Sequence, residues 1–234
     1  PGPNVITVNA VGSIQSRSIE IFFDSTQGSL NPVLRWNDAL REVIQADASL
    51  PPLAARAFAL THIAMLDVLG NIEGTSTFLV RQSPPIAIDG TAALSTAAYQ
   101  VMSYLFPARQ TLLDTTQNSI LNTIANSTAK TQGISFGHSL GEAVIELADK
   151  DGWNQFFAAL GSNEIGRWRE TTPLFDVAQL PHWGEVQPLA IENWDNLLPS
   201  GPPKLTSSQY ATAFNEVKVL GASNSTTRTS EQTQ

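Results

Sequence analysis

PPLAARAFALTHIAMLDVLGNI, residues 51 to 72, predicts a single helix that is apolar on nearly every side. Apolar residues recur at steps of three and four along one face: Leu53, Ala57, Leu60, Ala64 and Val68. Other apolar side chains fill most of the remaining sides: Phe58, Ile63, Leu66 and Leu69. A helix of this kind is typically enclosed by its neighbours, so we predict that it is the central helix of the fold.

The polar residues of this stretch are few and form no wide face. Arg56, Asp67 and Asn71 project within about 60° of one another when each residue turns the helix by about 100°, which predicts a narrow polar edge. His62 points well away from that edge. Because no His, Asp or Glu lies three or four residues from His62, the pattern favours a core histidine over a metal ligand.

The composition indicates a globular protein that does not bind nucleic acid. The chain has 234 residues, of which 42% are apolar and 15% are charged, and its net charge is −8. Its 13 Lys and Arg are scattered singly, so the basic patch of a nucleic-acid-binding protein is missing. The absence of cysteine excludes disulfides, thiolate nucleophiles and thiolate metal sites.

The sequence also predicts no membrane span and an exported protein. Arg56, His62 and Asp67 interrupt the longest apolar stretch, so no uninterrupted run reaches the roughly 18 residues of a membrane helix. The chain begins with Pro1, which indicates that any targeting peptide has been removed. We therefore expect an extracellular or periplasmic location.

Further helices are indicated outward from this stretch, and they predict an all-α antiparallel bundle over residues 31–160. Asn31 and Asp89 are candidate N-caps, whereas Pro107 ends a helix. A loop is expected between Gly70 and Asp89. The expected helices are approximately residues 32–46, 51–72, 90–106, 108–126 and 131–149.

Three other regions complete the expected single domain. Residues 1–30 carry two short β-branched or alternating runs and predict a hairpin or an extended arm. Residues 161–205 predict a wrapped irregular segment, rich in Pro and pinned by Trp168, Trp183 and Trp194. Residues 206–234 predict a last helix, with Thr206 and Gln209 at capping-box spacing and Gly221 as its stop, followed by a polar tail.

Residues 137–141, GHSLG, match the G-x-S-x-G pattern of a hydrolase nucleophile elbow. Ser139 would be the nucleophile, with Asp176 and His182 in hydrolase order. That elbow needs a buried strand before it, and the preceding segment NSTAKTQGISF is polar. The helical interpretation, in which the glycines allow close contact between helices, is therefore favoured.

The remaining motifs are weak. His138 is isolated in the sequence, and PSGP at residues 199–202 predicts a turn. Asn126 and Asn224 each begin an N-S-T glycosylation sequon. Lys218 and Arg228 would suit an oxyanion, although a solvated helix end and tail is the favoured interpretation.

Several blocks resemble the vanadium-dependent haloperoxidases, which belong to the type 2 phosphatidic acid phosphatase (PAP2) superfamily. AARAFALTHIAMLDVLGNI, with Trp36 and Arg41 upstream in RWNDALREVI, is similar to the family's N-terminal helical region. Later blocks resemble its bacterial branch in the same order: AAYQVMSYLFPA (97–108), GHSLGEAVIELADKDGW (137–153), GRWRETTP (166–173), LPHWGEVQPL (180–189) and YATAFNEVKVLGASNSTTRTSEQTQ (210–234). Together these blocks cover most of residues 33–234.

The resemblance implies an oxyanion cofactor that this chain does not hold by itself. In the family, vanadate, or phosphate in the phosphatases, is bound by a lysine, two arginines, the amides of a P-S-G-H turn and an apical histidine. All of these positions follow the stretch that matches TTRTSEQTQ. Residues 199–202 end in proline where the histidine belongs, and Lys218 and Arg228 match positions that are not ligands. No catalytic, cofactor-binding or metal residue is therefore assigned.

Three hypotheses follow from these observations. The first is the N-terminal scaffold part of a haloperoxidase-like or phosphatase-like enzyme, completed by a C-terminal half or companion chain that supplies the vanadate site. The second is a noncatalytic structural or assembly module derived from that family. The third is a serine hydrolase using Ser139. The sequence leaves a homo-oligomer open.

Overall fold

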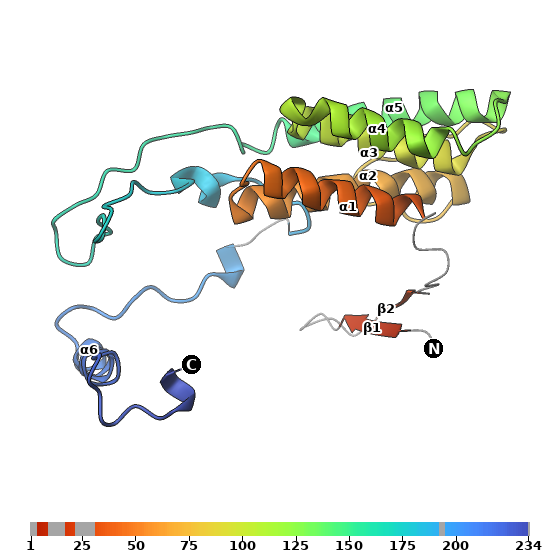
Figure 1. Cartoon of the computed structure of the whole chain (residues 1–234). Coiled ribbons are helices and arrows are strands. Elements are labelled where there is room, and N and C mark those ends of the chain that lie inside the picture. The colour runs from red at the N-terminus through yellow and green to blue at the C-terminus, as the bar shows by residue number, and fades with distance from the viewer. Residues whose placement is uncertain (1–3, 9–16, 22–30, 192–194, 234) are drawn as a thin grey trace. The chain divides into compact units, whose positions relative to one another are not determined.

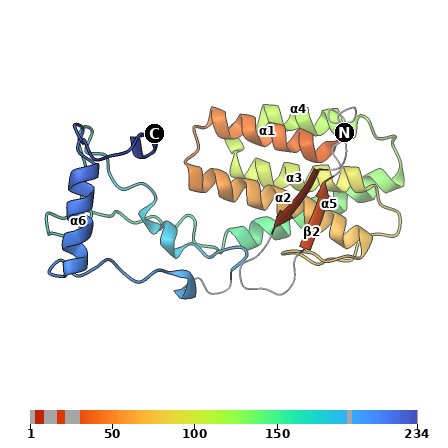
Figure 2. The same cartoon turned by 90° about the horizontal axis from the view of Figure 1, so that it is seen from below.

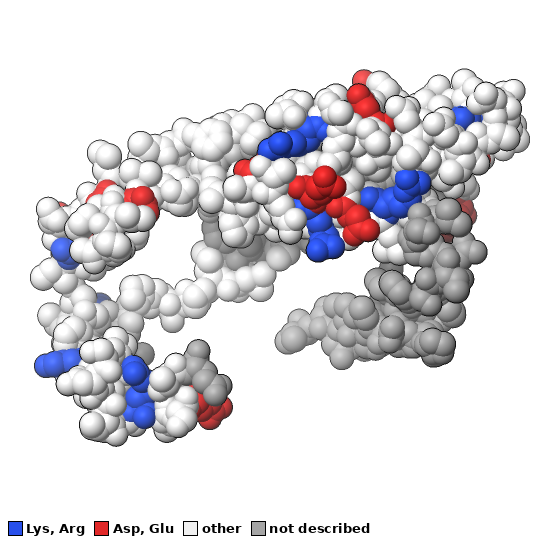
Figure 3. Space-filling model, in the orientation of Figure 1, with Lys and Arg blue, Asp and Glu red and all other residues white. Residues whose placement is uncertain are grey.

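The computed structural model describes residues 4–8, 17–21, 31–191 and 195–233. The chain divides into two compact units, residues 1–150 and 151–234. Six α-helices are found among the described residues, and the fold is all-α as predicted. Lys, Arg, Asp and Glu are interspersed on the face of the molecule shown in Figure 3.

The first unit contains five helices that lie side by side (Figures 1 and 2), and we call them the helical body. Its elements are α1 (Pro32–Ala46), α2 (Pro51–Glu73), α3 (Gly90–Leu105), the 3-10 helix η1 (Pro107–Arg109), α4 (Gln110–Leu121) and α5 (Thr128–Ala148). The predicted helix between residues 108 and 126 is therefore shorter than expected, and α5 begins earlier than expected.

Helix ends in the helical body follow the predicted capping residues, with one difference. The side-chain oxygen of Asn31 accepts a hydrogen bond from the backbone of Val33 (2.9 Å), and that of Asp89 accepts one from Ala92 (2.8 Å), which confirms both N-caps. However, α2 continues past Gly70 and ends where Gly74 adopts a left-handed φ of 67°. The loop after α2 therefore starts later than the sequence suggested.

The central helix of the body is α3, and the prediction that α2 occupies this position was wrong. Residues 92–98 of α3 are all buried, and α3 contacts α1, α2, α4 and α5. Its small side chains allow neighbouring helices to approach from every direction. By contrast, α2 leaves Leu66 51% exposed. An apolar pattern on all sides therefore did not identify the enclosed helix.

Helix α2 also has the length and composition of a membrane-spanning helix. The mean hydropathy of its most apolar window of 18 residues is 1.4. Half of that window is buried inside the protein. Because the core helix of a globular protein has the same properties, this finding is weak evidence for a membrane span.

Close contact between α3 and α5 depends on three glycines one turn apart. A Cβ placed on Gly137 would overlap the backbone oxygen of Ala93, and one on Gly133 would lie 2.5 Å from the oxygen of Asp89. A Cβ on Gly141 would lie 2.8 Å from the Cβ of Gln100. The helical interpretation of GHSLG is thus confirmed.

A buried chain of polar side chains joins α1, α3 and α4. The indole of Trp36 donates to the Ser95 hydroxyl (2.9 Å), which in turn donates to Gln117 (3.0 Å). The amide of Gln117 donates to Thr96 (3.2 Å), and the Thr96 hydroxyl donates to the backbone oxygen of Ala92 (2.8 Å). Such a satisfied network fixes the relative rotation of the three helices.

The second unit has one α-helix and little buried apolar surface. Its elements are the 3-10 helices η2 (Pro181–Glu185), η3 (Asp195–Leu197) and η4 (Glu231–Thr233) and the helix α6 (Ser208–Leu220). Ser207, not Thr206, caps α6. None of the residues of α6 is buried, and Trp168 is 50% exposed. Trp194 lies outside the described residues, so the pinning role of these tryptophans stays a prediction.

Within residues 1–30 the structure describes two strands, β1 (Asn4–Val8) and β2 (Arg17–Ile21). They pair antiparallel, with Val5 opposite Glu20. The other residues of this region lie outside the described part of the chain. An arm laid over the body therefore remains a prediction.

We expect Gly137→Ala to destabilise the protein by about 2 kcal/mol or more, because a backbone carbonyl blocks the added methyl group. The midpoint of urea unfolding measures this change. Gly90→Ala is the matched control, because its Cβ would meet only the Ile72 Cδ1 at 3.7 Å. Equal stability of the two variants would contradict the close contact.

Candidate functional site

Ser139 does not sit in a nucleophile elbow. It lies in the middle of the continuous helix α5, exposed, and its hydroxyl is 3.5 Å from the side-chain oxygen of Gln82. The residues directly before it, from Thr128 onward, are helical and not extended. Asp176 and His182 belong to the second unit, where Asp176 is exposed. The third hypothesis, a serine hydrolase, therefore lacks the strand-turn-helix geometry that it requires.

His182 is a buried structural residue of the second unit. Its Nε2 donates to the backbone oxygen of Trp153 (2.8 Å), and its ring contacts the edge of Phe156 at 4.6 Å between centroids. Nearby, the backbone of Gln187 donates to the oxygen of Asp151 (2.7 Å). These bonds hold the segment after residue 150 against η2. His182 therefore joins two segments of the second unit.

The other two histidines are also separate from one another. His62 is half-buried on α2, 3.3 Å from the Asn37 oxygen, and stacks on Phe58. Burial lowers the pKa of His62 below its ordinary value of 6.5. His138 is exposed and lies 3.3 Å from Glu142. Among the described residues, no three His, Asp or Glu side chains form a group that would hold a metal ion.

The polar edge predicted on α2 exists, but it points inward. Asp67 and Asn71 are buried, at 0% and 7% exposure. The Asp67 carboxylate accepts hydrogen bonds from three successive backbone N–H groups, those of residues 78–80. Asn71 donates to the oxygen of Val80 (2.9 Å) and accepts from the backbone of Gln82 (2.9 Å). These two side chains fix the loop after α2 to the helical body.

The apolar pattern of α2 does not predict this loop anchor, although the sequence holds a signal for it. Asp67 and Asn71 are one turn apart in an otherwise apolar helix, and buried polar groups need partners. The available partners were the backbone groups of the loop that follows. Arg56 on the same edge donates to the backbone oxygen of Ala148 at the end of α5 (2.8 Å).

Of the two cationic residues considered as oxyanion ligands, Arg228 binds the C-terminal end of α6 and Lys218 faces water. The guanidinium of Arg228 donates to the backbone oxygens of Leu220 (2.9 Å) and Ala222 (3.4 Å), and its Nε donates to Thr233. These bonds satisfy the carbonyls at a helix C-terminus. Lys218 is exposed. The favoured interpretation of both residues, a helix end and its tail, fits this arrangement.

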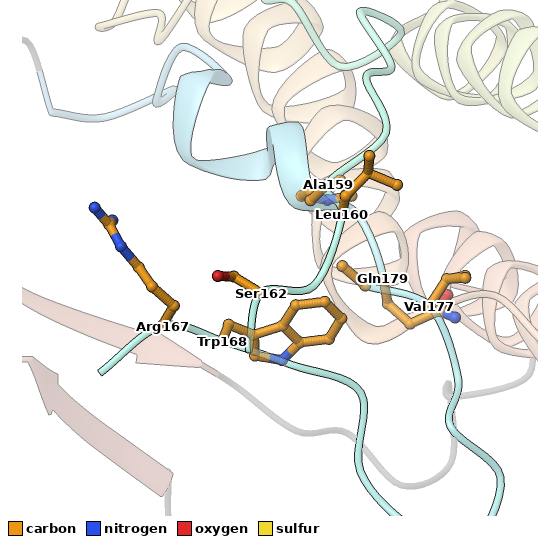
Figure 4. A pocket seen from close by; sticks show the side chains of 9 residues that line it. Ala159, Leu160, Ser162, Arg167, Trp168, Val177 and Gln179 are labelled. Atoms are coloured by element: carbon orange, nitrogen blue, oxygen red, sulfur yellow. The ribbon is translucent and has the colours of Figure 1, made fainter. Parts of the chain in front are cut away.

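The second unit contains an open pocket of 540 Å³ (Figure 4). Its apolar lining includes Leu160, Trp168 and Val177, and the side chain of Arg167 extends away from them. The hydroxyl of Ser162, also in the lining, accepts a hydrogen bond from the backbone of Glu164 (3.1 Å). The pocket thus offers apolar surface but no pair of groups for acid–base chemistry.

Comparisons with known proteins identify the fold. No family model matches the chain, and no curated protein matches its sequence. A solved structure, that of a bacterial vanadium-dependent iodoperoxidase, matches 81% of this chain with a TM-score of 0.68 and 18% identity. The chain spans 50% of that protein. It therefore has a vanadium haloperoxidase/PAP2-like fold, as the resemblance of the sequence blocks implied.

We expect Asp67→Asn to destabilise the protein by about 2 kcal/mol, because an amide replaces charged acceptors for three backbone donors. Hydrogen exchange at residues 78–80 should accelerate. The control is Asp38→Asn, which removes only an exposed ion pair with Arg41 and should change the free energy of unfolding by less than about 1 kcal/mol. Unchanged exchange in the loop would contradict the anchor.

The pKa of His62 predicts a loss of stability on acidification. Since the folded pKa lies below 6.5, the unfolded chain binds more protons between the two values, and the free energy of unfolding falls as the pH falls through that window. Urea unfolding at a series of pH values measures the slope. The slope should be reduced in His62→Gln and retained in the control His138→Gln; an unchanged slope in His62→Gln would refute the assignment.

Proposed function

We propose that this chain is the scaffold part of a vanadium haloperoxidase-like protein whose oxyanion site is supplied by residues outside these 234. The support is the fold of the helical body together with the length of the match. The chain spans half of the similar iodoperoxidase, so a comparable length of that protein has no counterpart here. We propose that this second part is a C-terminal continuation or a companion chain.

The donors of the helical body do not fit a vanadate ion. An oxyanion of this kind needs several cationic side chains that converge on one point. The described cations instead contact acceptors of the chain itself, as in these pairs: Arg56 with Ala148, Arg81 with Thr75, Arg109 with Asp47, Lys130 with Ile124 and Lys150 with Glu146. We therefore derive no reaction step from these residues.

The role we assign to the chain is to support the catalytic segment rigidly. The α3–α5 contact, the Trp36–Ser95–Gln117 network and the loop fixed by Asp67 give a rigid platform. A rigid platform keeps cationic donors on another segment in position, which electrostatic catalysis requires. For the complete protein we propose peroxide-dependent halide oxidation, or phosphoester hydrolysis on the same kind of site.

The second candidate function is a noncatalytic structural module. The observation that favours it is that cationic side chains of the helical body form hydrogen bonds or ion pairs with other groups of the same chain. The module hypothesis requires that the native protein lack activity even when vanadate is supplied. The two candidates are therefore separated by an activity measurement on the native protein.

We expect the complete native protein to oxidise iodide or bromide with hydrogen peroxide only after vanadate is added, and phosphate to compete with vanadate for the site. Triiodide formation or bromination of a phenol dye measures the first reaction, and hydrolysis of a nitrophenyl phosphate measures the alternative. The 234-residue chain, assayed in parallel, should show neither activity. Activity of this chain alone would refute the scaffold role, and inactivity of the complete protein in both assays would favour the module.

A further inference from the structure

Helix α2 has an apolar face that the helical body leaves partly open, although His62 near its centre lies 3.3 Å from the Asn37 oxygen of α1. This outer α2 face consists of Ala55, Phe58, Ala59, His62, Leu66 and Leu69, which fall on one side of the helix at 100° per residue. Ala55 and Leu66 are exposed, and the other four are only partly buried. The opposite side, which includes Leu60, Ala64 and Val68, is almost completely buried.

The distribution of polar residues on α2 is the reverse of that on a helix facing water. Arg56, Asp67 and Asn71 are buried on the inner side, where backbone groups of the chain satisfy them. The outer α2 face carries no charged side chain except His62 when it is protonated. A surface helix normally places its polar residues outward. The sequence of α2 is therefore that of a helix covered on both sides.

We infer that the outer α2 face is the docking surface for an apolar helical segment of the second part of the protein, outside these 234 residues. The inference rests on the proposed function. The length of the iodoperoxidase that lies outside the match leaves room for a second set of helices. Ala55 and Ala59, one turn apart, allow the backbone of such a helix to approach closely.

The size of the face argues against a second copy of the chain as its occupant. From Ala55 to Leu69 the face is about 21 Å long and about 10 Å wide. That footprint is well below the roughly 800 Å² per partner that a specific interface between separate molecules usually buries. A segment held in the same molecule or in a permanent assembly needs less area, because its effective concentration is high.

The test compares the reactivity of two single cysteines in the complete protein, since these 234 residues contain none. Leu66→Cys places a thiol on the outer α2 face, and Leu147→Cys is the matched control on α5; the leucines are 51% and 45% exposed in this chain. Labelling by a maleimide is followed at each position by peptide mass spectrometry, with circular dichroism as a check on folding.

We expect the thiol at position 66 to react at least about 100-fold more slowly than the thiol at position 147, because the docking segment excludes the reagent. Comparable rates would overturn the inference. Protection that the isolated 234-residue chain also shows and loses on dilution would assign the face to a second copy, and protection lost on deletion of residues 1–30 would assign it to the N-terminal region; either result would overturn the inference.

The labelling experiment and the activity assay can refute the docking surface and the proposed function separately. Vanadate-dependent activity with an unprotected thiol at position 66 would leave the proposed function standing and refute the docking surface. A protected thiol in a protein without activity would refute the proposed catalysis and retain the surface. A native polypeptide that ends at Gln234 and is monomeric by mass would refute both.

Discussion

The backbone-to-backbone approach of α3 and α5 sets the geometry of the helical body. Gly133, Gly137 and Gly141 lie along the face of α3 that carries Ala93 and Ala97 after the N-cap Asp89. A methyl group on any of the three glycines would meet an atom of α3 or its N-cap within 2.8 Å. With α5 this close, α3 is covered on one side by backbone. The small residues on its other sides then accept α1, α2 and α4. The close spacing of α3 and α5 follows from this contact.

Polar groups fix the arrangement that the small residues permit. The network from Trp36 through Ser95 to Gln117 joins three helices, and Asp67 with Asn71 ties down the loop after α2. A buried donor or acceptor without a partner is costly, so each of these groups disfavours other rotations of its helix. The inner side of α2 therefore buries its polar residues beside apolar ones, whereas its outer side is apolar and partly open. The proposed docking of a further helical segment rests on this difference between the two sides.

Local signals predicted much of the fold. Asn31 and Asp89 cap helices because their side chains reach backbone donors in the first turn, and Pro107 ends α3, as proline chemistry requires. The glycine spacing in GHSLG predicted helix contact rather than an elbow. The spacing of apolar residues shows which faces of a helix are apolar, but it does not show which of those faces neighbouring helices cover. For that reason α2 was mistaken for the central helix, and the inward direction of Asp67 was missed.

For the candidate site, the sequence predicted only that these 234 residues hold none of the oxyanion ligands. No catalytic residue was assigned, and the resemblance placed the oxyanion ligands in later sequence. The central claim is that the open side of α2 faces a segment outside these 234 residues. A photo-crosslinking amino acid at position 66 of the complete protein, followed by mass spectrometry, tests this claim most directly. The account predicts crosslinks to peptides outside residues 1–234; crosslinks confined to residues 1–30, to residues 151–234 or to position 66 of a second copy would contradict it.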